Sequence, residues 1–483
     1  MRAAVHNLGC KVNSYELDVI VQDLVAAGYE IVPFEEEAEV YIVNTCSVTN
    51  IADRKSRQML HRARHTSPDA LVVAVGCYVE TDRTSLEADP LVDLCVGNNR
   101  KGSMVPILQE ALAQKKRQAS LEEHPVEQGP SLEYLPGEPD SAADGGTKVS
   151  RGSSAPVDKT LGGRTMANLK DHPAYETMQL SRPGRTRADV KIQDGCNLFC
   201  SYCIIPYARG RIRSRDPEDI AQEVRRLSAT GTREVVLTGI HVSSYRQEEG
   251  LVPAQELLQL LQRLQLIAGI RRIRLSSLEP RIMTEDFVRG IRRLSKVCPH
   301  FHLSLQSGCD ATLQRMNRHY TSQQYLESVE RIRAAYDSPA ITTDVIVGFP
   351  GETQEEFDTT LEFVKKVGFY EVHVFRYSRR NGTAAASFPN PCTDQEKAVR
   401  SARLLALTKE QANAFREEFV GRREELLLEE EVVLGGESYF AGHTMRYVEG
   451  IVPAAGHHSG ELVSGVFEKR IPGTKYLLLR EEL

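Results

Sequence analysis

The sequence lacks tryptophan entirely, and only 6% of its 483 residues are aromatic. It also lacks an apolar run of the about 20 residues that a membrane-spanning helix needs. The segment from Met1 to Cys10 reads as a strand and has no long apolar core of the kind found in signal peptides. These absences predict a protein without a membrane partner, and we expect a cytoplasmic location.

The sequence has no excess of positive charge either. Its formal net charge is −6, which argues against a globally basic surface that coats nucleic acid, so any contact with RNA must be local. Ten cysteines in a chain of this length do not suit the disulfide framework of a small secreted domain. They favour metal binding or catalysis in a reducing compartment. With 41% hydrophobic residues, the chain can bury two or three separate cores.

The most informative segment is the loop Gly195–Cys203, which follows the strand-like Val190–Gln193. Its cysteines, Cys196, Cys200 and Cys203, have the spacing C-x3-C-x2-C. Three close thiolates can ligate three irons of a [4Fe–4S] cube and leave the fourth iron open to a substrate, whereas a structural metal site is normally closed by a fourth protein ligand that this stretch does not offer. The alternatives are a zinc site or three buried thiols.

Residues 1–113 alternate strands with helices, which predicts a parallel sheet with helices on its faces. The strands are expected at Ala3–Leu8, Val40–Val43 and Leu71–Val75. A helix is expected to begin after Ser14, as N-cap, and to stop at Gly28.

Three further cysteines follow the ends of these strands: Cys10, Cys46 and Cys77. In open α/β sheets, ligands collect beyond the carboxyl ends of the strands. Position alone leaves two interpretations open, a second iron–sulfur cluster or ordinary buried cysteines.

Residues 114–183 are rich in proline, glycine, serine and charge, which predicts a flexible linker or insertion. Residues 184–420 then repeat strand and helix. The strands are expected around Val190, Val235, Ile273, His302, Thr343 and Val372. This pattern predicts a partial (β/α)6 barrel with its active site at the carboxyl ends of the strands.

Residues 421–483 contain short apolar stretches separated by turns, which predicts a small β-barrel of a kind that binds RNA. Its acidic residues, from Glu424 to Glu431, argue against tight RNA binding by this part alone. The alternative is a structural cap on the larger barrel. The chain is thus predicted to be an α/β protein of three domains and a linker.

Basic residues occur in two short runs. Arg209, Arg211, Arg213 and Arg215 alternate along the chain, so an extended backbone would turn them to one face, where they could grip phosphates. The alternative is a set of salt bridges to nearby acids. The second run, from Arg271 to Arg274, is expected to be solvated.

Several segments carry a resemblance to known proteins. The cysteine loop, with Tyr202 before its last cysteine, resembles the signature of the radical-SAM superfamily. The segments Leu8–Asn13, Asn44–Thr49 and Val75–Cys77 resemble the N-terminal domain of the methylthiotransferase family, and Gly442–Tyr447 resembles its TRAM domain.

The resemblance implies cofactors, partners and site residues. It implies a catalytic [4Fe–4S] cluster on Cys196, Cys200 and Cys203, an auxiliary [4Fe–4S] cluster on Cys10, Cys46 and Cys77, and S-adenosylmethionine. The residues implied for binding S-adenosylmethionine are Tyr202, Gly239, His241, Glu279, Gln306 and Gly348. The implied partners are tRNA, a flavodoxin- or ferredoxin-like electron donor and a source of sulfur. Asp344 and Glu352 remain open between a catalytic and a structural role.

Within this family, Cys203–Gly210, Thr238–His241 and Tyr377–Thr383 resemble the type that acts on threonylcarbamoyladenosine 3′ of the anticodon. The implied reaction adds a methylthio group to C2 of that base. Alternatives are the same chemistry on isopentenyladenosine in tRNA or on a ribosomal protein, and a non-catalytic iron–sulfur protein that binds RNA. Cys95, Cys298, Cys309 and Cys392 are expected to be structural or free thiols.

Overall fold

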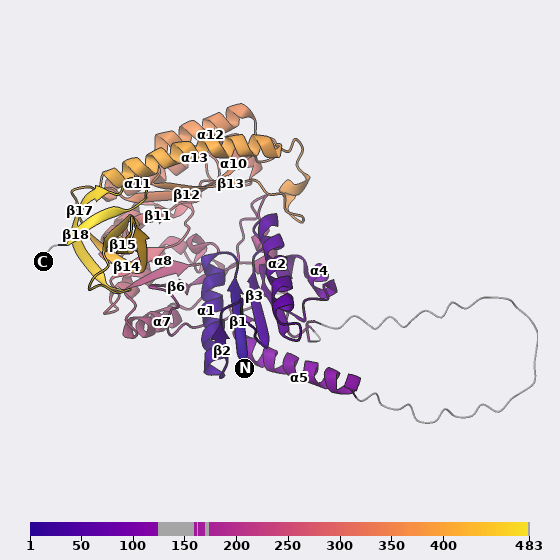
Figure 1. Cartoon of the computed structure of the whole chain (residues 1–483). Coiled ribbons are helices and arrows are strands. Elements are labelled where there is room, and N and C mark those ends of the chain that lie inside the picture. Colours follow the sequence, from indigo (N-terminus) through magenta and orange to yellow (C-terminus); the bar gives the residue numbers. More distant parts are fainter. Residues whose placement is uncertain (124–158, 162, 170–172, 482–483) are drawn as a thin grey trace, which may run out of the picture.

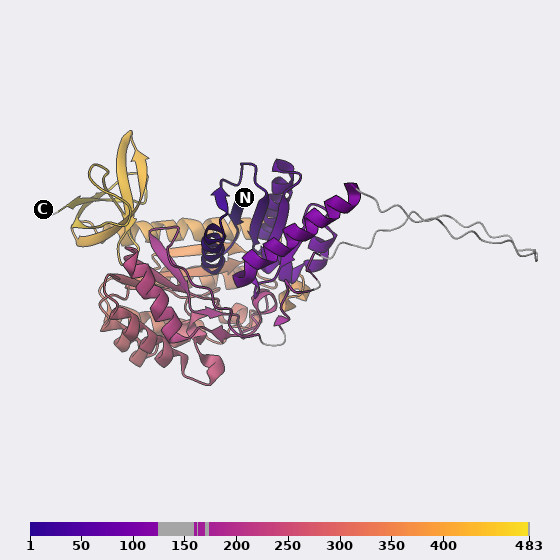
Figure 2. The same ribbon diagram turned by 90° about the horizontal axis from the view of Figure 1, so that it is seen from below.

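The computed structural model describes residues 1–123, 159–161, 163–169 and 173–481. An N-terminal α/β domain lies against a central barrel, and the C-terminal barrel projects at one end of the molecule (Figures 1 and 2). No helix within the described ranges combines the length and apolarity needed to cross a membrane.

The N-terminal domain is built on a five-stranded parallel sheet in the order β2-β1-β3-β4-β5. The strands are β1 (Arg2–Asn7), β2 (Glu30–Val32), β3 (Val40–Thr45), β4 (Leu71–Gly76) and β5 (Leu94–Val96). Its helices are α1 (Lys11–Ala26), α2 (Asn50–Thr66), α3 (Cys77–Thr81), α4 (Arg83–Ala88) and α5 (Met104–Glu123). Strands β3 and β4 are buried along their whole length, as expected for parallel strands covered on both faces. The predicted parallel sheet is confirmed.

The start of α1 differs from the prediction. The helix begins at Lys11 with Cys10 as its N-cap, and Ser14 lies inside it. The chain turns at Gly9, whose φ of 119° is in the region that favours glycine. The Ser14 hydroxyl accepts a hydrogen bond from the Asn7 amide at 2.9 Å instead of capping the helix. Because the turn comes early, Cys10 is held at the end of β1.

The central barrel contains two parallel three-stranded sheets, β6-β9-β10 and β11-β12-β13. The strands are β6 (Arg187–Lys191), β9 (Glu234–Thr238), β10 (Arg272–Leu275), β11 (His300–His302), β12 (Ala340–Val347) and β13 (Glu371–Arg376). A parallel bridge between Leu278 and Leu303 joins the sheets. The outer helices are α7 (Pro217–Ala229), α8 (Pro253–Gln265), α9 (Glu285–Arg292), α11 (Ser322–Ala335), α12 (Gln354–Val367) and α13 (Asp394–Glu417). Each of the six predicted strands is present.

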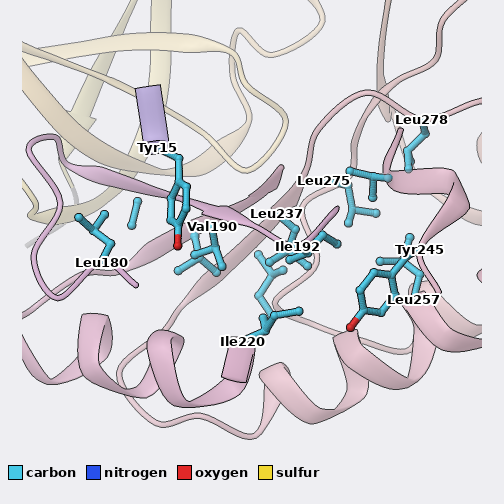
Figure 3. Close-up of a cluster of buried hydrophobic side chains, with 14 of the residues drawn as sticks. Tyr15, Leu180, Val190, Ile192, Ile220, Leu237, Tyr245, Leu257, Leu275 and Leu278 are labelled. Carbon is cyan, nitrogen blue, oxygen red and sulfur yellow. The ribbon is translucent and has the colours of Figure 1, made fainter. Parts of the chain in front are cut away.

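The main core runs from the N-terminal domain through both barrel sheets, and the part drawn in Figure 3 lies between the first barrel sheet and its helices. Val190, Leu237 and Leu275 come from the three strands and meet Ile220 of α7 and Leu257 of α8. Successive strand residues point to opposite faces, so the residues between these apolar ones face the barrel interior.

The C-terminal part forms a closed barrel in the order β14-β15-β16-β18-β17. Its strands are β14 (Arg423–Leu434), β15 (Glu437–His443), β16 (Glu449–Pro453), β17 (Leu462–Arg470) and β18 (Leu477–Glu481). Leu426, Leu428, Val452 and Phe467 fill its core. The predicted small β-barrel is confirmed.

A loop of this barrel plugs one end of the central barrel. The Tyr447 ring stacks on His300 with centroids 4.8 Å apart and planes at 7°. Guanidinium groups of Arg187 and Arg274 lie 5.0 and 4.8 Å from the same ring. These contacts give the C-terminal barrel the role of a cap.

Arg272 and Arg274 are buried beneath this cap, so the prediction that they are solvated is wrong. The Nε of Arg274 donates to a Glu234 carboxylate oxygen at 2.7 Å. Arg272 donates to the carbonyl of His443 at 2.8 Å. The sequence does not reveal this burial because the partners are provided by a distant strand and by the other barrel.

The predicted linker is partly packed. Residues 124–158 lie outside the described residues. Beyond them, the amide of Cys95 donates to the carbonyl of Lys159 at 2.9 Å, and the amide of Gly97 donates to Thr165 at 2.9 Å. These bonds attach Lys159 and Thr165 to the outer edge of the sheet beside β5. The prediction of a flexible linker is therefore wrong for this part of the chain.

Candidate functional site

The loop with Cys196, Cys200 and Cys203 lies between β7 (Gln193–Asp194) and α6 (Ile205–Arg209). Gly195 is required at its start, because a Cβ there would lie 1.9 Å from the Arg211 carbonyl oxygen. The loop closes through a hydrogen bond from the Cys203 amide to the Cys200 carbonyl at 2.9 Å. The three cysteines therefore come from one tight turn at the carboxyl end of β6.

These thiols lie in a setting that favours a shared cation. Burial is the main cause that raises the pKa of Cys196 to about 11 and that of Cys203 to about 12, and the neighbouring Cys200 contributes to both shifts. Without a metal, Cys196 and Cys203 are held as thiols, whereas bound iron would stabilise the thiolates. The guanidinium of Arg318 donates to the Cys200 sulfur at 3.3 Å. Sequence reasoning missed Arg318, because this contact spans much of the barrel and has no local signal.

The other triad is assembled from three strand ends. Cys46 directly follows β3, and Cys77 directly follows β4. Cys10 lies shortly after the end of β1 at Asn7. A Cβ at Gly9 would lie 3.2 Å from the Cys46 sulfur. Burial raises the pKa of Cys46 to about 11, and both other thiols of the triad add to the shift. The three thiols are thus close enough to interact, as the strand positions predicted.

A residue that sequence reasoning missed connects the two sites. The Asn98 amide lies 3.5 Å from the Cys77 sulfur and donates to the carbonyl of Ala208, in α6, at 2.8 Å. The Asn98 side chain therefore links Cys77 of the strand-end triad to α6, the helix that follows the cysteine loop. Nothing in the local sequence around Asn98 marks it for this role.

The spacing of the sulfurs tests the zinc alternative. Among the described residues, the only trio of histidine, cysteine or acidic ligands with atoms all within 4.8 Å of one another is His302, Asp344 and His373. In each cysteine triad at least one pair of sulfurs therefore lies more than 4.8 Å apart, beyond the about 4 Å that separates ligands on one zinc ion with Zn–S bonds of about 2.3 Å. This arrangement favours a multi-iron cluster over a single ion held by all three sulfurs.

One pocket of about 220 Å³ lies beside Cys203 and the segment that follows Cys46. Tyr202 and Cys203 line it from the cysteine loop, Gln306 and Asp344 from the barrel, and the Val48–Thr49 segment from beyond Cys46. Gln306 has a φ of 67°, an uncommon conformation for this residue type that turns the chain at the rim. The pocket gives a ligand access to the neighbourhood of both cysteine sites.

His241 and Glu279 lie together nearby, with the His241 Nε2 3.8 Å from a Glu279 oxygen. Burial lowers the pKa of His241 to about 4, so the ring is neutral at physiological pH. Within the described structure, the buried Nε2 has no hydrogen-bond partner. Such an atom is available to a polar ligand, which fits the expected binding of S-adenosylmethionine.

The two glycines predicted for this pocket have packing roles. A Cβ at Gly239 would lie 2.9 Å from the Gln193 side-chain oxygen, which also accepts from the His241 amide at 2.7 Å. A Cβ at Gly348 would lie 2.3 Å from Lys397. Glu352 is likewise structural, since it forms a buried ion pair with Arg400 at 2.6 Å.

The arginine run differs from the prediction. Arg209, Arg213 and Arg215 are buried, and only Arg211 is exposed. The run is not extended, because Arg209 belongs to α6. Arg215 forms an ion pair with Glu223, so the salt-bridge alternative describes three of the four. Arg211, whose guanidinium lies 4.4 Å from the Phe199 ring, remains a predicted RNA contact.

Arg209 belongs to a buried ionic network centred on Glu16 of α1. Glu16 accepts from Lys191 at 2.6 Å and Arg209 at 2.9 Å, and also pairs with Lys101. Asp194 accepts from Lys191 at 2.7 Å. All these side chains are buried. The network joins the N-terminal domain to the barrel between the two cysteine sites.

We expect the stability of this network to fall in acid. Burial acts to raise the pKa of Glu16, but the surrounding cations lower it well below 4.5. Such a carboxylate contributes stability that is present above about pH 4.5 and is lost as the pH falls towards its folded pKa. The urea midpoint should therefore drop between pH 5 and 3 more steeply in wild type than in Glu16→Gln. Equal slopes would contradict this expectation.

Two family descriptions match the chain: the Radical SAM superfamily over residues 190–364, and "Uncharacterized protein family UPF0004" over residues 2–97. The chain is 35% identical to the threonylcarbamoyladenosine tRNA methylthiotransferase MtaB of Bacillus subtilis, over 95% of this chain and 92% of that protein. It is 35% identical to the protein of that name from Aquifex aeolicus, over 91% of this chain and 95% of the relative.

A relative named for another tRNA nucleoside is also similar. The chain is 33% identical to the tRNA-2-methylthio-N(6)-dimethylallyladenosine synthase of Caldicellulosiruptor saccharolyticus, over 87% of this chain and 80% of that protein. Among solved structures, the radical S-adenosylmethionine methyltransferase TsrM from Kitasatospora setae matches with a TM-score of 0.51 and 18% identity, over 80% of this chain and 77% of that one. This last similarity supports the fold alone. The full-length identities show that the chain belongs to the MtaB type of the radical-SAM methylthiotransferase family.

Proposed function

We propose that this protein adds a methylthio group to C2 of N6-threonylcarbamoyladenosine, 3′ of the anticodon in tRNA. The observation that carries the proposal is the pocket lined by Cys203 of the loop triad and by Val48 and Thr49, which closely follow Cys46 of the strand-end triad. The relatives from Bacillus subtilis and Aquifex aeolicus, whose names state this activity, support the same substrate.

The family implies a [4Fe–4S] cluster and S-adenosylmethionine as cofactors. We assign the catalytic cluster to Cys196, Cys200 and Cys203 and an auxiliary cluster to the strand-end triad. When bound, the catalytic cluster supplies the electron that cleaves a C–S bond of S-adenosylmethionine, and the auxiliary cluster supplies sulfur.

The protein's own residues position the reactants and exclude water. Tyr202 and Gln306 line the pocket. His241 offers a buried ring nitrogen that has no hydrogen-bond partner within the described residues. Arg318 donates to a cluster ligand, an interaction of the kind that tunes bound clusters. A flavodoxin- or ferredoxin-like donor, a sulfur source and a cytoplasmic location complete the proposal.

Nucleoside mass spectrometry of bulk tRNA tests this function. In cells that lack the protein, the methylthio form of threonylcarbamoyladenosine should disappear, and the wild-type gene should restore it. A gene with Cys200→Ala should fail to restore it. If that nucleoside is unchanged while methylthio-isopentenyladenosine or the mass of a ribosomal protein shifts, the proposed substrate is wrong.

A further inference from the structure

The inner face of the central barrel is polar and charged, although such barrels are normally filled by layers of branched apolar side chains. Strand alternation places Asp189, Arg274, His302, Asp344 and His373 on the face opposite the apolar core. Of these five residues, Arg274 is buried, Asp189, His302 and Asp344 are partly exposed, and His373 is exposed, so the interior is open to solvent. An interior of this composition is suited to a polar ligand.

This polar interior continues from the cysteine pocket, the cavity of about 220 Å³ that Cys203 and Asp344 line. Asp344 lines the pocket, and its carboxylate lies 3.3 Å from the His302 Nε2. His373 pairs with Asp344 in the register of β12 and β13, and its ring lies 5.8 Å from that of His302. The three side chains therefore mark a passage from the pocket into the barrel.

Lys11 brings a cation to the same interior from the N-terminal domain. It is the first residue of α1, and it lines a second cavity of about 840 Å³ together with Asp189 and Tyr447. It is close enough to His373 to help lower the pKa of that ring, for which burial is the main cause. Within the described ranges, the Lys11 ammonium has no hydrogen bond or ion pair.

The other cations of this cavity that face the barrel already have acidic partners. Arg187 pairs with Glu429 at 3.0 Å, and Arg274 pairs with Glu234 at 2.7 Å. Asp189 lines the same cavity and attracts Lys11, but no ion pair joins the two within the described ranges, so the Lys11 ammonium is free to bind an anion there. A divalent metal on His302, Asp344 and His373 is disfavoured, because it would add positive charge beside Lys11 and Arg274.

We propose that the ammonium of Lys11 binds the carboxylate of the threonylcarbamoyl group, with Asp344 and His373 bordering the passage that leads to it from the cysteine pocket. This inference rests on the proposed function and names the residue that reads its substrate. An isopentenyl group has no carboxylate. An ion pair with Lys11 would therefore let the protein distinguish threonylcarbamoyladenosine from isopentenyladenosine.

The test compares two RNAs on the full-length, cluster-loaded protein. One is an anticodon stem-loop with threonylcarbamoyladenosine, and the other is the same RNA with its carboxylate converted to the methyl ester. Wild type should convert the acid with a kcat/KM about 10- to 100-fold above that of the ester, the range expected for one charge-assisted contact. The dissociation constants, measured by fluorescence anisotropy, should differ in the same sense.

In Lys11→Met, the preference for the acid should collapse to about one, and Lys11→Arg should keep part of the preference. Partial loss of iron at the adjacent Cys10 would lower the conversion of both RNAs alike. The ratio of kcat/KM for the acid to that for the ester would therefore not change. The inference is overturned if wild type does not prefer the acid, or if Lys11→Met keeps the preference. If wild type converts neither RNA but modifies an isopentenyladenosine stem-loop, the proposed function fails instead.

Discussion

Replacement of Cys200 by alanine is expected to abolish the cleavage of S-adenosylmethionine and the formation of product while the protein remains folded. Cys200 is one of only three sulfur ligands that the loop provides, so its loss leaves a cluster with two protein ligands. The Ala side chain fits the buried position with little loss of packing. Reductive cleavage, followed with dithionite by the release of 5′-deoxyadenosine, should fall to the uncatalysed background.

Two companion variants sharpen this test. Cys95→Ala removes a thiol that is equally buried but belongs to neither triad, so it should retain cleavage. Cys77→Ala alters the other triad and should retain cleavage but form no methylthio product. Full turnover by Cys200→Ala would refute the assignment of the catalytic cluster, and loss of cleavage in Cys95→Ala would show that the assay reports folding.

Replacement of Glu16 by leucine is expected to lower the free energy of unfolding by about 3–5 kcal/mol, the cost of removing one partner from a buried ionic group. Lys101, Lys191 and Arg209 would lose their shared carboxylate in a site that water does not reach. Urea unfolding at pH 7, followed by circular dichroism, measures this loss.

The matched control is Asp23→Ala, on the same helix but in a partly exposed position. It should change stability by no more than about 0.5 kcal/mol. If both variants lose the same amount, the network does not hold the domains together in the way that its contacts indicate.

The sequence predicted what local patterns control. The strands of the barrel follow from short apolar runs. The two cysteine triads follow from spacing and from their place after strands, and their assignment to clusters remains a prediction. These signals are all contained in segments of a few residues.

What the sequence did not predict depends on contacts between distant segments. Arg215 looks like a phosphate-binding residue until Glu223 and Tyr15 are packed around it. Arg318 and Asn98 are ordinary loop residues until the fold places them beside a cysteine sulfur. The start of α1 was misplaced because a cysteine, which the usual cap preferences do not favour, occupies the N-cap.

The loop of Tyr447 that plugs the central barrel has a consequence for truncation. Arg272 donates to the His443 carbonyl, and Arg274 donates to the Met445 carbonyl at 3.0 Å. A chain shortened before residue 421 would remove these carbonyl acceptors, leave Glu234 as the remaining partner of the two buried guanidinium groups, and uncover His300. Loss of tRNA modification in such a fragment would therefore report damage to the barrel floor as much as the loss of an RNA-binding module.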